Sequence, residues 1–114
     1  MSSLLTKLLA VIFLVIGVLG FILPSPLLGL FEVDPVHNVI HILTGVVAAF
    51  AAMKGRAASR IFLILFGIIY AIVALLGFVM NGNILGIIHV NMPDNWLHFG
   101  IALACLLVGL RKHT

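Results

Sequence analysis

Residues 20–41 read GFILPSPLLGLFEVDPVHNVIH, and residues 77–98 read GFVMNGNILGIIHVNMPDNWLH. The two stretches align without a gap when Gly20 is placed on Gly77, an offset of 57 residues that carries through the chain. The matched glycines, asparagines and histidines carry most weight, because these residues are few or costly in an apolar chain. They pair as Gly20 with Gly77, Gly29 with Gly86, Asn38 with Asn95, and His41 with His98. The 114-residue chain is therefore predicted to be one domain, residues 1–114, built as a tandem repeat of residues 1–57 and 58–114.

The composition indicates a membrane protein. Hydrophobic residues make up 64% of the chain and charged residues only 8%, which lies outside the range of soluble domains. Four apolar stretches lie at residues 4–23, 36–53, 61–80 and 95–110, each near the ~20 residues needed to cross a bilayer. The predicted fold class is an all-α membrane protein of four transmembrane helices, arranged as two tandem helical hairpins with pseudo-two-fold symmetry.

The charged residues separate onto two sides if the four spans alternate in direction. All the basic residues then fall on one side, namely Lys7, Lys54, Arg56, Arg60, Arg111 and Lys112. The acids and two histidines fall on the other side, namely Glu32, Asp34, Asp94, His37 and His89. Because basic residues concentrate in cytoplasmic loops, both termini are predicted to be cytoplasmic. The net charge of +3 does not indicate nucleic-acid binding, since the basic residues are scattered over helix ends.

The second and fourth spans begin with the same kind of signal. Asp34 followed by Pro35 is an N-cap with proline at the first helical position, and Asn91 is the matching cap of the fourth span. Asp94, three residues after Asn91, is expected to complete a capping box. The predicted role of Asp34, Asn91 and Asp94 is therefore to start helices.

Two helix faces share a pattern that is polar at one end and small along the rest. One stripe consists of Asn38, His41, Gly45, Ala48 and Ala52, and the other of Asn95, His98, Ala102, Cys105 and Gly109. Residues at spacings of three and four lie on one face of a helix. Small residues let membrane helices approach closely, and polar residues hydrogen-bond across the contact. We therefore expect the second and fourth helices to pack along these stripes, with Cys105 as a small packing residue.

The polar ends of the stripes, Asn38 with His41 and Asn95 with His98, have a structural interpretation. In it, His41 bonds Asn95 or a backbone group and His98 bonds Asn38, and each link contributes about 0.6–2 kcal/mol to helix association. The same histidines are also candidates for an ion or proton path, because imidazole titrates near neutral pH.

A second interpretation makes His41 and His98 the ligands of a cofactor. Imidazole binds transition metals and the iron of haem, and two facing helices with one histidine each are a typical arrangement for such a site. His37 and Asp34 lie one turn or two before His41 and can add ligands for an ion such as zinc or copper. A haem or another tetrapyrrole is the alternative within the same class, and the absence of any cofactor remains the simpler expectation.

The two connections on the acidic side, residues 24–34 and 81–91, are themselves apolar. Lying flat at the membrane interface, or pairing with each other as a short ribbon, would satisfy their backbone groups. Glu32 and His89 are aligned by the repeat, and they are expected either to meet there or, more simply, to be solvated.

The segments LLGLFEVDPVHNVIHILTG and ILGIIHVNMPDNWLHFGIA, at residues 27–45 and 84–102, resemble a family of uncharacterised small bacterial four-span membrane proteins, a domain of unknown function. The positions that carry the resemblance are Asp34, Pro35, His37, Asn38, His41, Asp94, Asn95, Trp96 and His98. The resemblance implies the four-helix fold and a multi-pass location in the bacterial cytoplasmic (inner) membrane. It implies no activity.

No catalytic triad, paired carboxylates or phosphate-binding glycine loop is found in the sequence, so a non-enzymatic role is expected. The main functional hypothesis is an accessory or assembly subunit that presents lipid-facing surfaces to other membrane proteins. Its expected partners are the lipid bilayer and either a membrane protein or further copies of itself. The alternative hypothesis is a metal-, haem- or tetrapyrrole-binding membrane protein that uses His41 and His98.

Overall fold

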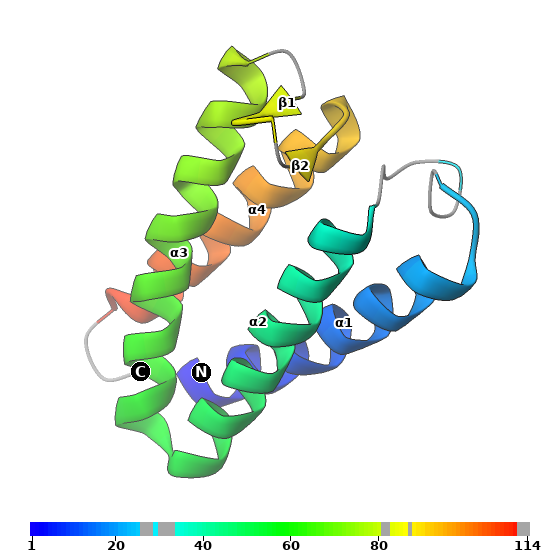
Figure 1. The fold of residues 1–114 in the computed structure, drawn as a ribbon. Helices are drawn as coiled ribbons and strands as arrows, with labels where there is room; N and C mark the ends of the chain where they lie inside the picture. The colour runs from blue at the N-terminus through cyan, green and yellow to red at the C-terminus, as the bar shows by residue number, and fades with distance from the viewer. Residues whose placement is uncertain (26–28, 30–33, 81–82, 87, 112–114) are drawn as a thin grey trace.

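A computed structural model describes residues 1–25, 29, 34–80, 83–86 and 88–111 of the chain. Within these residues the protein consists of four helices and one short β hairpin (Figure 1). The helices are α1 (Ser2–Ile22), α2 (Pro35–Lys54), α3 (Arg56–Val79) and α4 (Met92–Gly109), and the strands are β1 (Asn83–Ile84) and β2 (Ile88–His89). The four predicted apolar stretches thus each correspond to one helix.

Three of these helices, α1, α2 and α3, are long and apolar enough to cross a membrane. The fourth predicted span does not meet the same measure of length and composition over the described residues. Its first turns carry the polar side chains Asp94, Asn95 and His98, all of which are buried inside the protein. The polar side chains that lower the mean hydropathy of α4 therefore face the other helices and not the outside of the protein.

The starts of α2 and α4 follow the predicted capping pattern. The Asp34 carboxylate accepts a hydrogen bond of 2.8 Å from the backbone N–H of His37, and Pro35 is the first residue of α2. At α4 the Asn91 side chain accepts from the Asp94 backbone N–H at 2.9 Å, and the Asp94 carboxylate accepts from the Asn91 backbone N–H at 3.0 Å. These reciprocal bonds form the predicted capping box and satisfy two backbone donors that a bare helix end would leave without partners.

The helices pack as two neighbouring pairs, α1 with α2 and α3 with α4 (Figure 1). Glycines make the first contact close, because a Cβ on Gly17 would come 3.1 Å from the backbone N of Ile42, and one on Gly45 would come 3.0 Å from the backbone N of Leu14. In the second pair, a Cβ on Gly109 would lie 3.1 Å from the Cβ of Leu63. The smallest residues therefore mark the contact within each hairpin.

The expectation that α2 and α4 pack along their stripes is wrong. Among the described residues α2 and α4 make no close backbone contact, and Gly45 faces α1 while Gly109 faces α3. Both stripes are buried, apart from the partly exposed Ala52, but each is buried mainly against the preceding helix of its own pair. Consecutive elements of a chain are usually adjacent in space, and the periodicity of one helix does not specify its partner.

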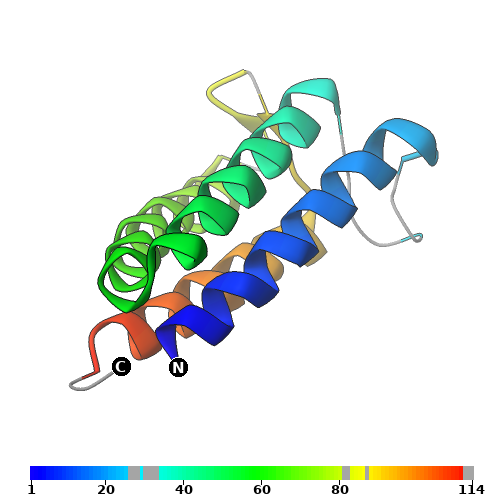
Figure 2. The same ribbon diagram turned by 90° about the horizontal axis from the view of Figure 1, so that it is seen from below.

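The two hairpins are joined by Gly55, which alone separates α2 from α3. Its φ of 111° lies where only glycine is comfortable, so the chain can reverse direction in one residue. At this end α1 begins and α4 ends (Figures 1 and 2). Arg60 of α3 donates a hydrogen bond of 2.7 Å from its Nε to the carbonyl of Gly109, and so holds the last turn of α4 against α3.

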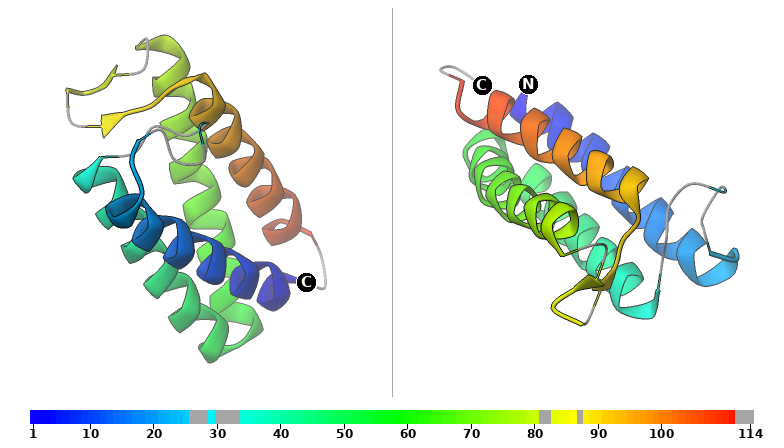
Figure 3. Two further views of the ribbon diagram at one scale, coloured as in Figure 1. Left: turned by 90° about the vertical axis from the view of Figure 1, so that its right-hand side faces the viewer. Right: turned by 90° about the horizontal axis from the view of Figure 1, so that it is seen from above.

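The opposite end carries the β hairpin (Figure 3). Asn83 pairs with His89 and Ile84 with Ile88 in antiparallel register, so the described part of the second connection pairs with itself. Residues 26–28 and 30–33 of the first connection, and with them Glu32, lie outside the described residues. The two halves do meet here, because the His89 backbone N–H donates to the Asp34 carboxylate at 3.3 Å.

The interior is small and is formed by all four helices. Its apolar members include Phe13, Ala48, Leu63, Tyr70 and Cys105. Cys105 is a buried free thiol, as expected of a packing residue. Large apolar side chains point outward along every helix, for example Phe50 at 63% exposure and Leu107 at 60%. Such an outer surface suits a lipid environment far better than water.

Candidate functional site

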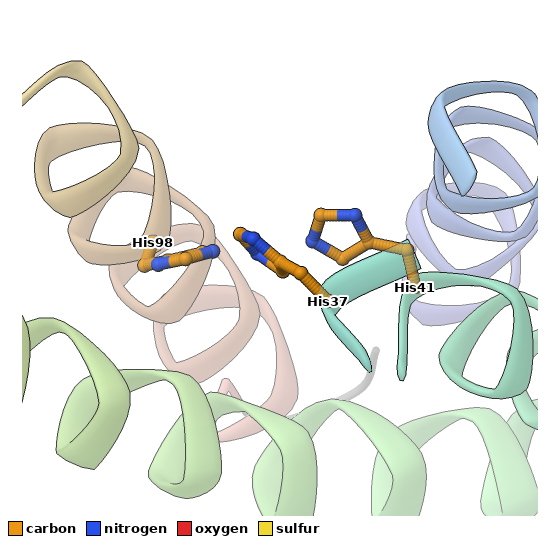
Figure 4. Close-up of side chains that lie close together, drawn as sticks. All are labelled: His37, His41 and His98. Atoms are coloured by element: carbon orange, nitrogen blue, oxygen red, sulfur yellow. The ribbon is translucent and has the colours of Figure 1, made fainter. Parts of the chain in front are cut away.

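Three histidines converge in the interior near the β-hairpin end. His37 and His41 are one turn apart on α2, and His98 reaches them from α4 (Figure 4). One ring nitrogen of each lies within 4.8 Å of the others. The ring centroids are 4.3 Å apart for His37 and His41, 5.6 Å for His37 and His98, and 6.3 Å for His41 and His98. All three side chains are buried.

The helix caps position these side chains. Asp34 starts α2 three residues before His37, so the cap and the proline that follows it orient the first turn that carries the histidine. The capping box of Asn91 and Asp94 does the same for α4, whose next turn carries His98. Although α2 and α4 are not in backbone contact, the long imidazole side chains bridge the space between them.

An aromatic pair supports the histidines from the side of α1 and α3. Phe13 and Tyr70 stack at a centroid distance of 5.4 Å and an interplanar angle of 29°. Phe13 lies 5.3 Å from the ring of His41, and Tyr70 lies 5.5 Å from the ring of His98. His41 and His98 therefore each rest against an aromatic ring of their own hairpin.

Two hydroxyl groups lie beside the cluster. Thr44 donates to the Ile40 carbonyl at 2.8 Å, and its Oγ1 lies 3.1 Å from the Tyr70 Oη. Because the Thr44 proton is used on the backbone, the Tyr70 O–H is the donor in the second bond. The Tyr70 oxygen keeps its capacity to accept a hydrogen bond at the edge of the histidine cluster.

The histidines, Thr44 and Tyr70 line a cavity of about 190 Å³, whose other walls are apolar side chains such as Ile40 and Ile88. Pockets for drug-sized organic ligands measure roughly 300–1,000 Å³. A haem or another tetrapyrrole does not fit between His41 and His98, since the ring of His37 is close to both. The cavity is suited to a single ion with at most a small additional ligand.

His41 and His98 have ring nitrogens that no hydrogen bond from the described residues satisfies. Among the described residues, three buried ring nitrogens of these two histidines have no hydrogen-bond partner. They are both nitrogens of His41 and the Nδ1 of His98. A buried polar group without a partner costs about 1–3 kcal/mol, so native proteins rarely keep one without a reason. A metal ion would use the lone pairs that the protein leaves unpaired.

The prediction of hydrogen bonds between the histidines and the asparagines is wrong. No bond joins His41 to Asn95 or His98 to Asn38 in the described chain, and the Oδ1 atoms of both asparagines lack partners. Asn38 instead lies against Gly20, and Asn95 lies against Gly77 and bonds weakly to the Met92 sulfur at 3.8 Å. Each asparagine packs against a glycine of the helix before it in the chain, because the hairpins pack within themselves.

Of the predicted metal ligands, the structure brings His37, His41 and His98 together and leaves Asp34 outside their group. Asp34 uses both carboxylate oxygens on backbone N–H groups. Thr44 and Tyr70 were not predicted from the sequence. Thr44 could have been predicted, because it lies three residues after His41 and thus on the same helix face. Tyr70 stands out in the sequence only as the single tyrosine of the chain.

This combination defines an all-helical protein of the multi-pass membrane type with a buried histidine cluster. Residues 4–111 match the family model described as a domain of unknown function, DUF4383, and the chain belongs to this family. The resemblance to an uncharacterised family is thereby confirmed. No curated protein and no solved structure matches the chain.

Proposed function

We propose that the protein binds a single transition-metal ion inside the membrane through His37, His41 and His98. The observation that carries this proposal is the convergence of three buried histidines whose ring nitrogens lie within 4.8 Å of one another. Imidazole is a preferred ligand of zinc, copper, iron and nickel. The unpartnered nitrogens of His41 and His98 are the atoms that such an ion would take.

The geometry requires only a small adjustment for binding. Metal–nitrogen bonds of about 2.0–2.1 Å place the nitrogens of a tetrahedral site roughly 3.4 Å apart. The present separations of up to 4.8 Å must therefore shrink by about 1.4 Å at most. Rotation of the imidazole rings can supply this, because the rings line a cavity and, among the described residues, no hydrogen bond holds either nitrogen of His41 or the Nδ1 of His98.

The proposed setting is four crossings of the membrane, with both termini in the cytoplasm of a bacterial cell. The charge distribution supports it, since Lys54 and Arg56 flank the turn between α2 and α3 and Arg111 follows α4, while Asp34 and Asp94 cap helices at the opposite end. The burial of the polar first turns of α4 also supports the fourth crossing, because α4 then presents apolar residues to lipid.

A tandem repeat with pseudo-two-fold symmetry is part of the same proposal. Phe13 and Tyr70 are offset by the repeat length, and each contacts the histidine of its own hairpin. The contact of Asn38 with Gly20 likewise corresponds to the contact of Asn95 with Gly77. His37 breaks the symmetry because its counterpart is Asp94, which is used as a cap, and so the site has three histidines and not four.

Metal loading tests the proposed function. The full chain, purified in mild detergent, is incubated separately with Zn(II) and with Cu(I) under reducing anaerobic conditions, desalted and analysed for metal. We expect about one ion per chain for at least one of the metals. Mutation of a residue that only hydrogen-bonds to a metal ligand lowers metal affinity by about 10–100-fold. Removal of a ligand itself, as in His41→Ala or His98→Ala, should therefore weaken binding by more than about tenfold.

The matched control is His89→Ala, because His89 is exposed and lies outside the cluster. It should bind metal like the parent chain. Equal metal content in the parent and in a folded double variant, His41→Ala with His98→Ala, would refute the proposed site.

The non-enzymatic role as an accessory or assembly subunit stays a prediction, and one observation favours it as a second candidate. The outer face of α3 and α4 has a groove of about 660 Å³ lined by apolar residues, including Phe78, Trp96, Phe99 and Leu103. Trp96 and Phe78 meet edge to face at 5.1 Å. The stripes of small residues do not contribute to such a surface, since both pack mainly within the hairpins.

A further inference from the structure

The charge of the ligands in the histidine site indicates which ion it takes. The donor set consists of three imidazoles, and a coordinating imidazole is neutral. Among the described residues that line the cavity there is no carboxylate and no thiol. Asp34 is occupied by the backbone N–H groups of His37 and His89, Asp94 is part of the capping box, and Cys105 does not reach the cavity. A bound ion would therefore keep its full charge.

The surroundings of the site make a high charge costly. The walls away from the histidines are apolar, and among the described lining residues the only other polar side chains are the hydroxyls of Thr44 and Tyr70. The ring of Phe13, a buried core residue, lies 5.3 Å from that of His41, and the proposed setting places lipid outside the helices. The solvation penalty of an ion rises with the square of its charge, so a divalent ion pays about four times the penalty of a monovalent ion of the same size.

The number of ligands points in the same direction. Three protein ligands leave a divalent zinc ion one short of its tetrahedral shell, which a water or hydroxide must complete. Cu(I) has a filled d shell and a single charge, and it is stable with three imidazole nitrogens alone. Copper is also among the metals to which imidazole is well suited.

We infer that the site binds monovalent copper, Cu(I), in preference to divalent Zn(II), Co(II) or Ni(II). This inference rests on the proposed metal site and adds the identity and charge of the ion. Its basis is three neutral ligands in an apolar cavity of about 190 Å³ that contains no described acidic side chain.

Competition between ions tests the inference on the full chain in lipid nanodiscs. Cu(I), kept reduced with ascorbate under argon, is titrated against the chelator bathocuproine disulfonate, and Zn(II) and Co(II) against chelators of suitable affinity. We expect Cu(I) to bind more than about tenfold tighter than either divalent ion, a difference of about 1.4 kcal/mol. Ag(I), a redox-silent monovalent ion, should compete with Cu(I), and Cys105→Ala should leave the Cu(I) affinity unchanged.

A second variant tests the charge argument directly. Thr44→Asp places a carboxylate on the cavity wall, and it should lower the ratio of Cu(I) to Zn(II) affinity by about tenfold, because the added charge favours the divalent ion more. An unchanged ratio in a folded variant would contradict the argument from charge.

The two proposals fail in different ways. Binding of Zn(II) or Co(II) that depends on the histidines and equals or exceeds that of Cu(I) would overturn the preference for monovalent copper and leave the metal site standing. No histidine-dependent binding of any of these ions would overturn the proposed function itself.

Discussion

Single glycines determine how closely the helices of each hairpin approach. Gly45 shows this best, because its surroundings include backbone as well as side-chain atoms of α1. A Cβ there would lie 2.8 Å from the Leu14 Cγ, 3.0 Å from the Leu14 backbone N and 3.1 Å from the Ala10 carbonyl oxygen. Backbone atoms cannot rotate away, so any larger residue must move a whole helix.

Gly45→Ala is therefore expected to destabilise the protein by about 1–3 kcal/mol, the usual cost of overpacking. The measurement is thermal unfolding of the purified chain in detergent. The matched control is Gly100→Ala, also within a helix, where an added Cβ meets nothing within 4 Å. That variant should be neutral or gain up to about 1 kcal/mol, because alanine favours the helix over glycine. A Gly45→Ala protein as stable as the parent would show that α1 and α2 do not pack as described.

At the scale of the element, the starts of two helices differ from those of the other two. The described residues show side-chain caps at α2 and α4 but none at α1 and α3. The two capped helices are those that carry the histidines. A cap fixes the orientation of the first turns, and the histidines of the proposed metal site lie in those turns.

Asn91→Ala should lower stability by about 0.5–2 kcal/mol, since it removes one side of the capping box. We also expect weaker metal binding, because His98 follows the cap by two turns and relies on it for position. Asn83→Ala is the control, as Asn83 is exposed on the β hairpin and makes no cap. Unfolding and metal titration of both variants give the comparison, and equal behaviour would mean that the cap does not position His98.

At the scale of the whole molecule, the four proposed crossings determine the side of the membrane on which each helix ends. α1, α2 and α3 have the length and composition of spans, whereas α4 depends on its neighbours to bury its polar turns. If α4 crosses, its last residue lies on the same side as the turn between α2 and α3. If it does not cross, that residue lies on the side of the β hairpin.

Labelling of single cysteines distinguishes the two topologies. In a Cys105→Ala background, Asn83→Cys, Met53→Cys and Leu110→Cys each replace an exposed residue. With four crossings, a membrane-impermeant maleimide should label Asn83→Cys in intact cells, and should label the other two only after the membrane is disrupted. Labelling of Leu110→Cys together with Asn83→Cys in intact cells would exclude the fourth crossing.

Local signals were sufficient for much of the fold. The apolar stretches predicted four helices, and the residues Asp34, Asn91 and Asp94 predicted two helix starts, because capping depends on side chains a few positions away. The histidines were identified as candidate ligands for a similar reason, since they are rare polar residues on otherwise apolar faces.

The sequence by itself thus determined the helices, their caps and which residues belong on the buried faces, because all of these follow from spacing along one chain segment. Only the tertiary structure decided that Gly45 faces α1 and not α4, that Asn38 and Asn95 contact glycines and not histidines, and that Tyr70 reaches Thr44. The physical reason is that helix periodicity specifies a face but not its partner. The partner is set by which packing of all four helices leaves the fewest voids and strained contacts.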